Sequence, residues 1–339
     1  MTECPPDLGH LTARPVVAES PLAERDSLQH FRNLVDVDAL SSRDIDRIFQ
    51  RASALRAAST PLGNMSVQTL RGHIVGMLFF EPSTRTRLSF ELAAQRLGAV
   101  SIPLEVSRSS IEKAETLYDT LQTLVALGVT IAVIRHTDNQ VYEGLCGRLD
   151  LSILNAGHGV IAHPTQALLD AFTLQQRMGT LDKKVIVLCG DIRHSRVARS
   201  NIKLLHRLGA ELVLTGPPQL LPSKSELPVQ SNIRIASLDE VIPFADAIMC
   251  LRVQHERHQR EGTDRAMSAQ EYLLDYGLTA QRFAKARPEC VLLHPGPVNR
   301  GTEVEASLVE HARSLIVEQV RNGLYIRMAA LEWLAKVIL

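Results

Sequence analysis

The chain has 339 residues, a length that suits two domains better than a single core. Its 37 lysines and arginines balance its 37 aspartates and glutamates, so no overall charge favours binding to nucleic acid or a membrane surface. No apolar run approaches the roughly 20 residues of a membrane-spanning helix, and we see no signal-peptide core near the start. We therefore expect a cytoplasmic protein in which any anion site is local.

The five cysteines are scattered and lack the spacing of metal ligands: Cys4, Cys146, Cys189, Cys250 and Cys290. Three of them lie in apolar, strand-like runs. This pattern predicts reduced and mostly buried thiols rather than a disulfide framework or a metal site.

The N-terminal segment, residues 1–30, contains four prolines and shows little hydrophobic periodicity. We expect an extension or arm outside the folded core. A disordered tail is the other interpretation. After it, Ser41 or Ser42 can cap a first helix that runs through Leu55.

From residue 73 onward, strand and helix patterns alternate, which is typical of parallel sheets with helices on both faces. Strands are predicted at 73–80, 100–106, 129–135, 151–155, 184–190, 211–215, 232–236, 246–251 and 290–294. Helices are predicted at 84–97, 112–127, 140–148, 165–178, 196–208 and 238–244, and 308–339 is largely helical. Two polar, charged stretches, 108–115 and 254–266, are predicted to be binding loops or lids, with solvated surface as the alternative.

One junction stands out, at residues 83–86, where the apolar strand 73–80 leads into a helix that ends at Gly98. Ser83, Thr84, Arg85 and Thr86 add two kinds of hydrogen-bond donor to the free N–H groups of the helix start. This arrangement suits a phosphate or another dianion. An ordinary Ser N-cap beside a solvated Arg is the alternative for so short a motif.

The longer run Phe-Glu-Pro-Ser-Thr-Arg-Thr-Arg-Leu-Ser-Phe-Glu at 80–91 resembles the carbamoyl phosphate loop of the aspartate and ornithine carbamoyltransferases. The resemblance extends over roughly residues 33 to 335 and implies two doubly wound α/β domains. It assigns 31–163 with 319–339 to carbamoyl phosphate binding, and 164–318 to aspartate binding. The last helix would cross back onto the first domain.

Carbamoyl transfer needs a phosphate cradle, donors to the carbonyl oxygen as it becomes an oxyanion, and an acceptor for the carbamoyl NH2 group. Ser83, Thr84, Arg85 and Thr86 would form the cradle. By resemblance, Arg135 at a strand end contacts the phosphate and the carbonyl. His163, in His-Pro-Thr-Gln-Ala-Leu-Leu-Asp, would donate to the carbonyl oxygen without necessarily being the base. The remaining assignments, also by resemblance, are contacts to the carbamoyl NH2 from Gln166 and from the backbone at Pro295 or Gly296.

The acceptor is favoured to be aspartate. Ornithine enzymes of the family place a functional Cys where this chain has Pro295. Two carboxylates require fixed cations, and by resemblance Arg196 holds the α-carboxylate while Arg252 and Gln254 hold the β-carboxylate. Gly190 begins a tight turn, but without a G-x-G-x-x-G pattern a dinucleotide site is weakly supported.

Ser109 and Lys113 resemble the loop with which family members reach into a neighbouring subunit's site. This implies a homotrimer with shared active sites, whereas the segment by itself reads as a charged helix start. Ala114 stands where the family often has Gly.

The resemblance thus implies transfer of the carbamoyl group to the α-amine of L-aspartate in de novo pyrimidine biosynthesis. No metal or organic cofactor is implied. Catalysis would depend on Arg85, Thr86, Arg135, His163 and Lys113. Two alternatives stay open: another amino acid such as ornithine as acceptor, or a silent or partner-dependent subunit. The second arises because some longer bacterial members carry a similar N-terminal extension and assemble with dihydroorotase.

Overall fold

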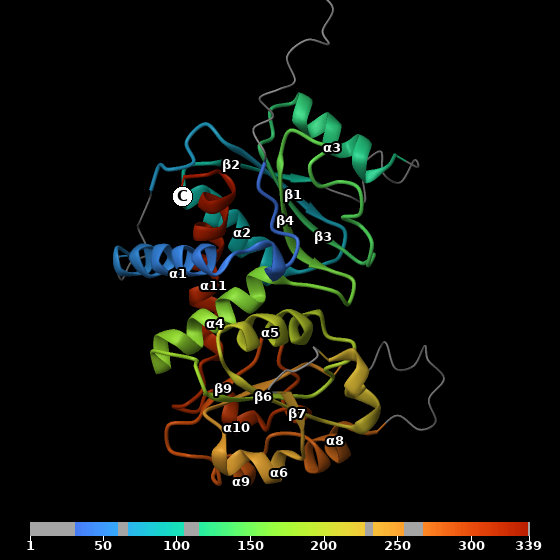
Figure 1. The fold of residues 1–339 in the computed structure, drawn as a ribbon, viewed down its shortest axis with the longest axis vertical. Helices are drawn as coiled ribbons and strands as arrows, with labels where there is room; N and C mark the ends of the chain where they lie inside the picture. Colours follow the sequence, from blue (N-terminus) through green and yellow to red (C-terminus); the bar gives the residue numbers. More distant parts are fainter. Residues whose placement is uncertain (1–30, 60–66, 105–114, 228–232, 254–266, 338–339) are drawn as a thin grey trace, which may run out of the picture. The chain divides into compact units, whose positions relative to one another are not determined.

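The computed structural model describes residues 31–59, 67–104, 115–227, 233–253 and 267–337, which contain two all-parallel sheets (Figure 1). The first sheet has the strand order β2-β1-β3-β4. Its strands are β1 (Ile74–Phe79), β2 (Val100–Leu104), β3 (Ile131–His136) and β4 (Ser152–His158). The second has the order β7-β6-β5-β8-β9. Its strands are β5 (Val185–Cys189), β6 (Glu211–Thr215), β7 (Ile233–Ile235), β8 (Ala247–Cys250) and β9 (Val291–Leu293).

Both sheets are doubly wound, as predicted. In the first, the order reverses between β1 and β3, and in the second it reverses between β5 and β8. Connections leave to opposite faces at such a point, which opens a crevice beyond the carboxyl ends of the two strands. The loops that follow these four strands are therefore placed to form a site.

Helices cover the sheets on both faces. The longer ones are α1 (Ser42–Ala57), α2 (Thr84–Arg96), α3 (Leu117–Ala126), α4 (Pro164–Met178), α5 (Arg196–Arg207) and α11 (Ile316–Leu334). The shorter ones are α6 (Leu238–Val241), α8 (Ala269–Asp275), α9 (Ala280–Phe283) and α10 (Ala306–Val309). Of the helices in the described ranges, none is long and apolar enough to cross a bilayer.

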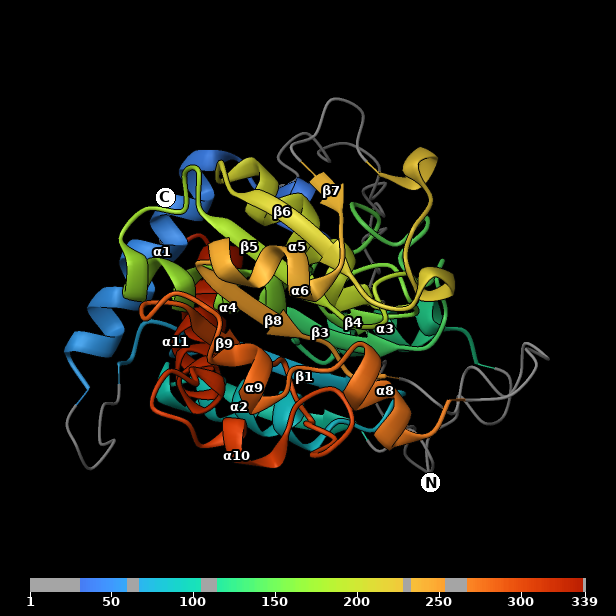
Figure 2. The same ribbon diagram turned by 90° about the horizontal axis from the view of Figure 1, so that it is seen from below.

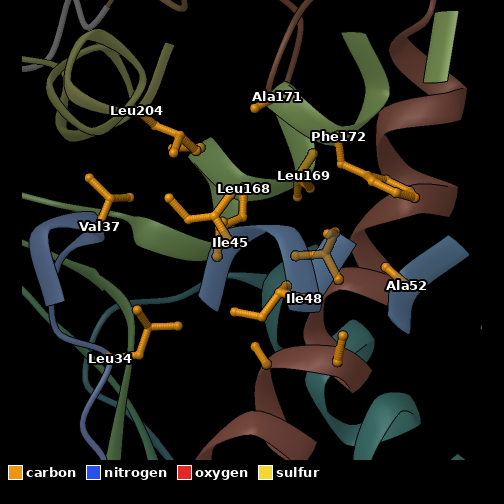
Figure 3. Packing of buried hydrophobic residues seen from close by; sticks show 14 of the residues in the cluster. Leu34, Val37, Ile45, Ile48, Ala52, Leu168, Leu169, Ala171, Phe172 and Leu204 are labelled. Atoms are coloured by element: carbon orange, nitrogen blue, oxygen red, sulfur yellow. The ribbon is translucent and has the colours of Figure 1, made fainter. Parts of the chain in front are cut away.

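The C-terminal helix α11 ties the two sheets together. It packs against α1 and α2, beside the first sheet, and against α4, which in turn packs on α5 of the second sheet. Figure 1 shows α4 and α11 running between the sheets. Several buried side chains of α1 and α4 meet there, including Ile45, Ile48 and Leu168 (Figure 3). One continuous hydrophobic core therefore extends from the inner face of one sheet to that of the other.

The two outer faces have smaller cores of their own. On the first sheet, Leu121 and Leu124 of α3 pack on Leu78 of β1. On the second, α6 and α9 lie over the strands, as Figure 2 shows in orange, with Phe283 fully buried. The central strands of each sheet are thus buried on both sides, which accounts for their nearly continuous apolar runs.

Most predicted elements are confirmed to within a few residues, and the predicted cap is present. Ser41 accepts a hydrogen bond from the Asp44 N–H, and Asp44 bonds back to the Ser41 N–H, which forms a capping box at the start of α1. The helix predicted at 140–148 is wrong, because this stretch is a series of turns. Gly144 and Gly147 have positive φ angles of 70° and 78°, a conformation that a right-handed helix does not contain.

Candidate active site

A cavity of about 410 Å³ lies where the crevices of the two sheets meet. It is bordered by the loops after β1, β3, β5, β8 and β9 and by the first turns of α4 and α11. The predicted site residues that line it are Ser83, Thr84, Arg85, Thr86, Arg135, His163, Gln166, Arg196, Arg252, Pro295 and Gly296. Ser109, Lys113 and Gln254 lie outside the described residues, as do residues 1–30.

The junction between β1 and α2 leaves its donors available. Ser83 is the N-cap residue of α2, yet its side chain makes no capping hydrogen bond. Thr86 is buried one turn into the helix, whereas Arg85 is partly exposed to the cavity. Because the first N–H groups of a helix have no partner within it, this end offers backbone donors, hydroxyl groups and a guanidinium together.

Glu81 holds two arginines at the edge of the cavity. Its Oε1 accepts hydrogen bonds from Arg135 Nη2 and Arg196 Nη2, both at 2.7 Å, and its Oε2 accepts one from Arg196 Nη1 at 2.8 Å. Burial by itself would raise the pKa of Glu81. The hydrogen bonds and charges of Arg196 and Arg135 outweigh burial and lower this pKa below its ordinary value. The carboxylate is therefore ionised at neutral pH and links the first sheet to α5.

Arg135 lies at the end of β3 as predicted, and the residue is 8% exposed. Besides Glu81, it donates from Nη1 to the Ala156 carbonyl oxygen at 3.2 Å. Burial and the charge of Arg196 lower its pKa to about 10, so it keeps its charge at neutral pH. Gly157 makes this packing possible. A Cβ there would lie 3.1 Å from Arg135 Nη1 and 3.2 Å from Arg196 Nε, and its φ of +111° already disfavours other residues.

His163 is the N-cap residue of α4 and is 4% exposed. Its backbone N–H donates to Ser200 Oγ at 2.9 Å, which fixes the start of the helix. Burial, followed by the charges of Arg135 and Arg196, holds the pKa of the imidazole well below its ordinary value. A neutral imidazole in this place can donate one hydrogen bond but is a weak base.

The turn after β9 approaches Arg85 closely. Gly296 has a φ of +69°, and a Cβ there would lie 3.3 Å from Arg85 Cζ. Its N–H donates to His294 Nδ1 at 2.8 Å, which anchors the turn to the buried His294 ring. Only glycine suits this position without displacing the guanidinium.

The cavity is strongly cationic. Among the described residues that line it are five arginines and one carboxylate, Glu81: Arg85, Arg135, Arg196, Arg252 and Arg327. Partial burial, together with the charge of Arg252, lowers the pKa of Arg85, as expected for two cations that face the same space. Such a cavity is built for a substrate, or a pair of substrates, with several negative charges. No cluster of three or more potential metal-ligating side chains occurs within the described ranges.

Several residues at the site were not singled out from the sequence. Glu81 lies within the run 80–91 that resembles the carbamoyl phosphate loop, and this position was the one signal in the sequence that it belongs to the site. Asp170 closes the His-Pro-Thr-Gln motif and is fully buried behind the cavity. Gln319 and Arg327 come from α11, where a buried polar residue on an otherwise apolar face was the available signal.

Comparisons with known proteins agree with this geometry. Residues 32–176 match the family described as "Aspartate/ornithine carbamoyltransferase, carbamoyl-P binding domain", and residues 182–334 match "Aspartate/ornithine carbamoyltransferase, Asp/Orn binding domain". The chain is 44% identical over 305 residues to the "Aspartate carbamoyltransferase catalytic subunit" of Listeria welshimeri, covering 90% of this chain and 96% of the relative. It is 41% identical over 313 residues to that of Ligilactobacillus salivarius, covering 91% and 96%.

Solved structures give the same result. An aspartate transcarbamoylase from Trypanosoma cruzi in complex with carbamoyl phosphate superposes with a TM-score of 0.79 at 31% identity, covering 88% of this chain and 94% of that one. The same enzyme in complex with N-(phosphonacetyl)-L-aspartic acid superposes with a TM-score of 0.76 at 31% identity and the same coverage.

Proposed function

The chain belongs to the aspartate/ornithine carbamoyltransferase family, and we propose that it transfers the carbamoyl group of carbamoyl phosphate to the α-amine of L-aspartate. The products are N-carbamoyl-L-aspartate and phosphate, in pyrimidine biosynthesis. The observation that carries the proposal is the cavity itself. Five arginines and one carboxylate line it, beside the start of α2, where the Ser83 side chain makes no capping hydrogen bond.

The phosphate end of carbamoyl phosphate would bind at the β1–α2 junction. Ser83, Thr84, Arg85 and Thr86 supply donors there, and the helix start adds its partial positive charge. Arg135 lies beside them, and Glu81 holds its guanidinium in place. Because these cations are fixed before the substrate arrives, little reorganisation opposes binding.

The carbamoyl end would face α4 and the turn after β9. His163 and Arg135 would donate to the carbonyl oxygen as it gains negative charge. Gln166 and the backbone at Pro295 or Gly296 would accept from the NH2 group. That these residues line the same cavity supports a reacting carbon between oxyanion donors and NH2 acceptors.

L-Aspartate would bind on the side of the second sheet. Arg196 would hold the α-carboxylate, while Arg252, with Gln254 beyond the described residues, would hold the β-carboxylate. The cationic cavity favours aspartate over ornithine, whose side-chain ammonium would face several arginines. Pro295, at the position of the ornithine enzymes' Cys, supports the same choice.

Proton transfer is best assigned to the departing phosphate. The amine must lose a proton after it attacks the carbonyl carbon. Of the cavity's described groups, Glu81 is held by two arginines with a lowered pKa, and His163 has a pKa well below its ordinary value. Both are therefore weak bases, whereas the phosphate leaves from the same centre and can take the proton. The protein then acts mainly by positioning two anions and stabilising the tetrahedral intermediate.

We also propose a homotrimer with shared active sites, in which Ser109 and Lys113 reach a neighbouring site. Support comes from exposed apolar side chains on a helix and an edge strand that contact each other: Leu88 and Leu92 of α2, and Val100 and Ile102 of β2. Such a patch beside an unpaired strand edge is typical of an interface. Mixing inactive Lys113→Ala subunits with inactive His163→Ala subunits should restore activity, because some sites would receive both intact residues. Confirmed subunit exchange without recovery would contradict the sharing.

The division of the chain follows from the same assignment. We propose 31–163 with 319–339 as the carbamoyl phosphate domain and 164–318 as the aspartate domain. The packing of α11 on α1 and α2 supports the return of the C-terminus to the first domain. Residues 1–30 would be an extension, with dihydroorotase as a candidate partner and the cytoplasm as the compartment.

The experiment that tests the function is phosphate release by the purified chain with carbamoyl phosphate and either L-aspartate or L-ornithine. Aspartate-dependent release is the expected result. Ornithine-dependent release would overturn the acceptor assignment. If neither amino acid causes phosphate release, the assay would be repeated with dihydroorotase added. No release in that assay either would overturn the proposed activity.

A further inference from the structure

A buried carboxylate behind the cavity joins side-chain amides from three helices. Asp170 of α4 is fully buried. Its Oδ1 accepts hydrogen bonds from Gln166 Nε2 at 2.9 Å and from Gln319 Nε2 of α11 at 2.8 Å. Its Oδ2 accepts one from Asn201 Nδ2 of α5 at 2.9 Å. The network therefore joins α4, α5 and α11.

The charge of Asp170 determines which way Gln166 faces. An ionised carboxylate can only accept hydrogen bonds, so each amide must turn its NH2 group toward it. Gln166 then has its Oε1 left for the cavity that it lines. In this orientation the Gln166 Oε1 can accept a hydrogen bond from the carbamoyl NH2 group of the substrate. With the amide reversed, the Gln166 NH2 group would face the carbamoyl NH2 group, and two donors would meet.

The same carboxylate also supports the turn after β9. With its NH2 group on Asp170, Gln319 offers its Oε1, which accepts from the His294 N–H at 2.9 Å. The His294 ring accepts from the Gly296 N–H on Nδ1, so its Nε2 carries the proton and donates to Glu303 Oε1 at 3.0 Å. Asp170 is thus linked, through one amide and one histidine, to the turn that contains Gly296.

We propose that Asp170 is a positioning residue for recognition of the carbamoyl NH2 group. It touches no substrate, but it sets the orientation of the Gln166 amide and anchors the Pro295–Gly296 turn through Gln319. The consequence is selectivity: the site should prefer carbamoyl phosphate over an acyl phosphate that has no NH2 group. This inference rests on the proposed function, since it assigns the NH2 end of the same substrate.

The test compares three ligands that differ at one end only. Acetyl phosphate carries a methyl group where carbamoyl phosphate carries NH2, and inorganic phosphate lacks the acyl group. Dissociation constants would be measured by calorimetry for the wild type and for Asp170→Asn. In the variant, the preference for carbamoyl over acetyl phosphate should fall by about tenfold, the effect of one hydrogen bond to a misoriented group. Phosphate affinity should stay within about twofold, because the cradle at α2 is untouched.

Thr173→Val is the matched control. Thr173 is buried on the same helix, and its Oγ1 donates to the Leu169 carbonyl oxygen at 2.7 Å and accepts from Asn322 Nδ2 of α11 at 3.0 Å. It therefore joins α4 to α11 and is not one of the hydrogen-bond partners of Asp170. This variant should lose stability and keep the ligand preference. A positioning role also predicts that Asp170→Asn adds little to the loss caused by Gln166→Ala, whereas full additivity would contradict it.

A folded Asp170→Asn variant that keeps the wild-type preference would overturn the inference while leaving the proposed function intact. If that variant does not fold, Gln319→Met removes one arm of the network. It should reduce the same preference, and an unchanged preference would again overturn the inference. A wild type that binds no carbamoyl phosphate would remove the proposed function, and this inference with it.

Discussion

The two strand-to-helix junctions at the cavity, β1–α2 and β5–α5, have similar positions in their sheets but use their N-cap serines differently. Each follows a central strand of a parallel sheet at the point where the strand order reverses, and each has a serine as helix N-cap. At the start of α5, Ser195 Oγ accepts from the Ala198 N–H at 3.1 Å. At the start of α2, Ser83 makes no such bond. The α5 junction thus uses its serine within the helix start, whereas the α2 junction leaves its donors available to a ligand.

The comparison shows that an N-cap residue identifies a helix start but not its role. At α5 the turn is completed by its own side chains, since Asp191 Oδ1 also accepts from the His194 N–H at 3.1 Å. What this junction gives the site is Arg196, the first residue of the helix. Glu81, from the other junction, binds that arginine and so connects the two.

The largest effect is expected from removing the cation of the ligand-binding junction. Arg85→Ala should lower kcat/KM by about 10²- to 10³-fold, because a fixed charge beside the reacting phosphate is lost in a site that excludes water. The fold should be unchanged by circular dichroism. Arg87→Ala is the control on the same helix, since Arg87 is exposed and bonds Glu91 at 2.8 Å. Near-normal turnover of Arg85→Ala would remove the phosphate assignment.

The link between the junctions can be broken with Glu81→Gln. The change leaves Arg135 and Arg196 with a neutral partner, so the two guanidinium groups repel each other and lose their fixed orientation. We expect kcat/KM for aspartate to fall by about 10- to 100-fold. Steady-state kinetics would measure this, with Glu91→Gln as the control, since Glu91 also pairs with an arginine but does not line the cavity. An unchanged KM for aspartate would mean that Glu81 does not position Arg196.

The serines provide the sharpest contrast. Ser195→Ala removes a cap and should lower the free energy of unfolding by about 1 kcal/mol. Ser83→Ala removes no cap, so stability should be retained while carbamoyl phosphate affinity falls by about tenfold. Urea denaturation and calorimetry on both variants would measure the two quantities. Equal stability losses would mean that the two junctions do not differ as described.

A further effect concerns the pH dependence of stability and involves Asp170 of α4, behind the cavity. Burial raises the pKa of this carboxyl from 3.8 to about 6, against the hydrogen bonds from Asn201, Gln319 and Gln166. The folded protein therefore binds this proton more tightly than the unfolded chain does. Its contribution to stability is full below pH 3.8 and is lost as the pH rises through about 6.

Relative to Asp170→Asn, the wild type should thus lose up to about 3 kcal/mol of unfolding free energy between pH 4 and pH 7. Only the pH dependence matters, because any constant cost of the substitution cancels. Urea denaturation at several pH values would measure the slope of this difference. Parallel curves for the two proteins would show that Asp170 does not titrate in this range.

The sequence was sufficient to predict the alternation of strands and helices, the capped start of α1 and the residues at the strand ends. These features depend on hydrophobic period and on turn and cap residues within a few positions, which local sequence contains. It failed at 140–148, where the two glycines adopt positive φ angles that the apolar spacing did not indicate. The long motif also indicated which residues to expect at the site, but not which side chains they would contact.

Only the tertiary structure decided those contacts. Glu81 and Arg196 are 115 positions apart, and Asp170 and Gln319 are 149 apart. Their meeting depends on how the two sheets, α4 and α11 pack around the shared core. The free hydroxyl of Ser83 and the orientation of the Gln166 amide were decided in the same way. Gln166 meets Asp170 only four residues along the same helix. The packing of α4 against α5 and α11, however, brings the distant amides of Asn201 and Gln319 to that carboxylate.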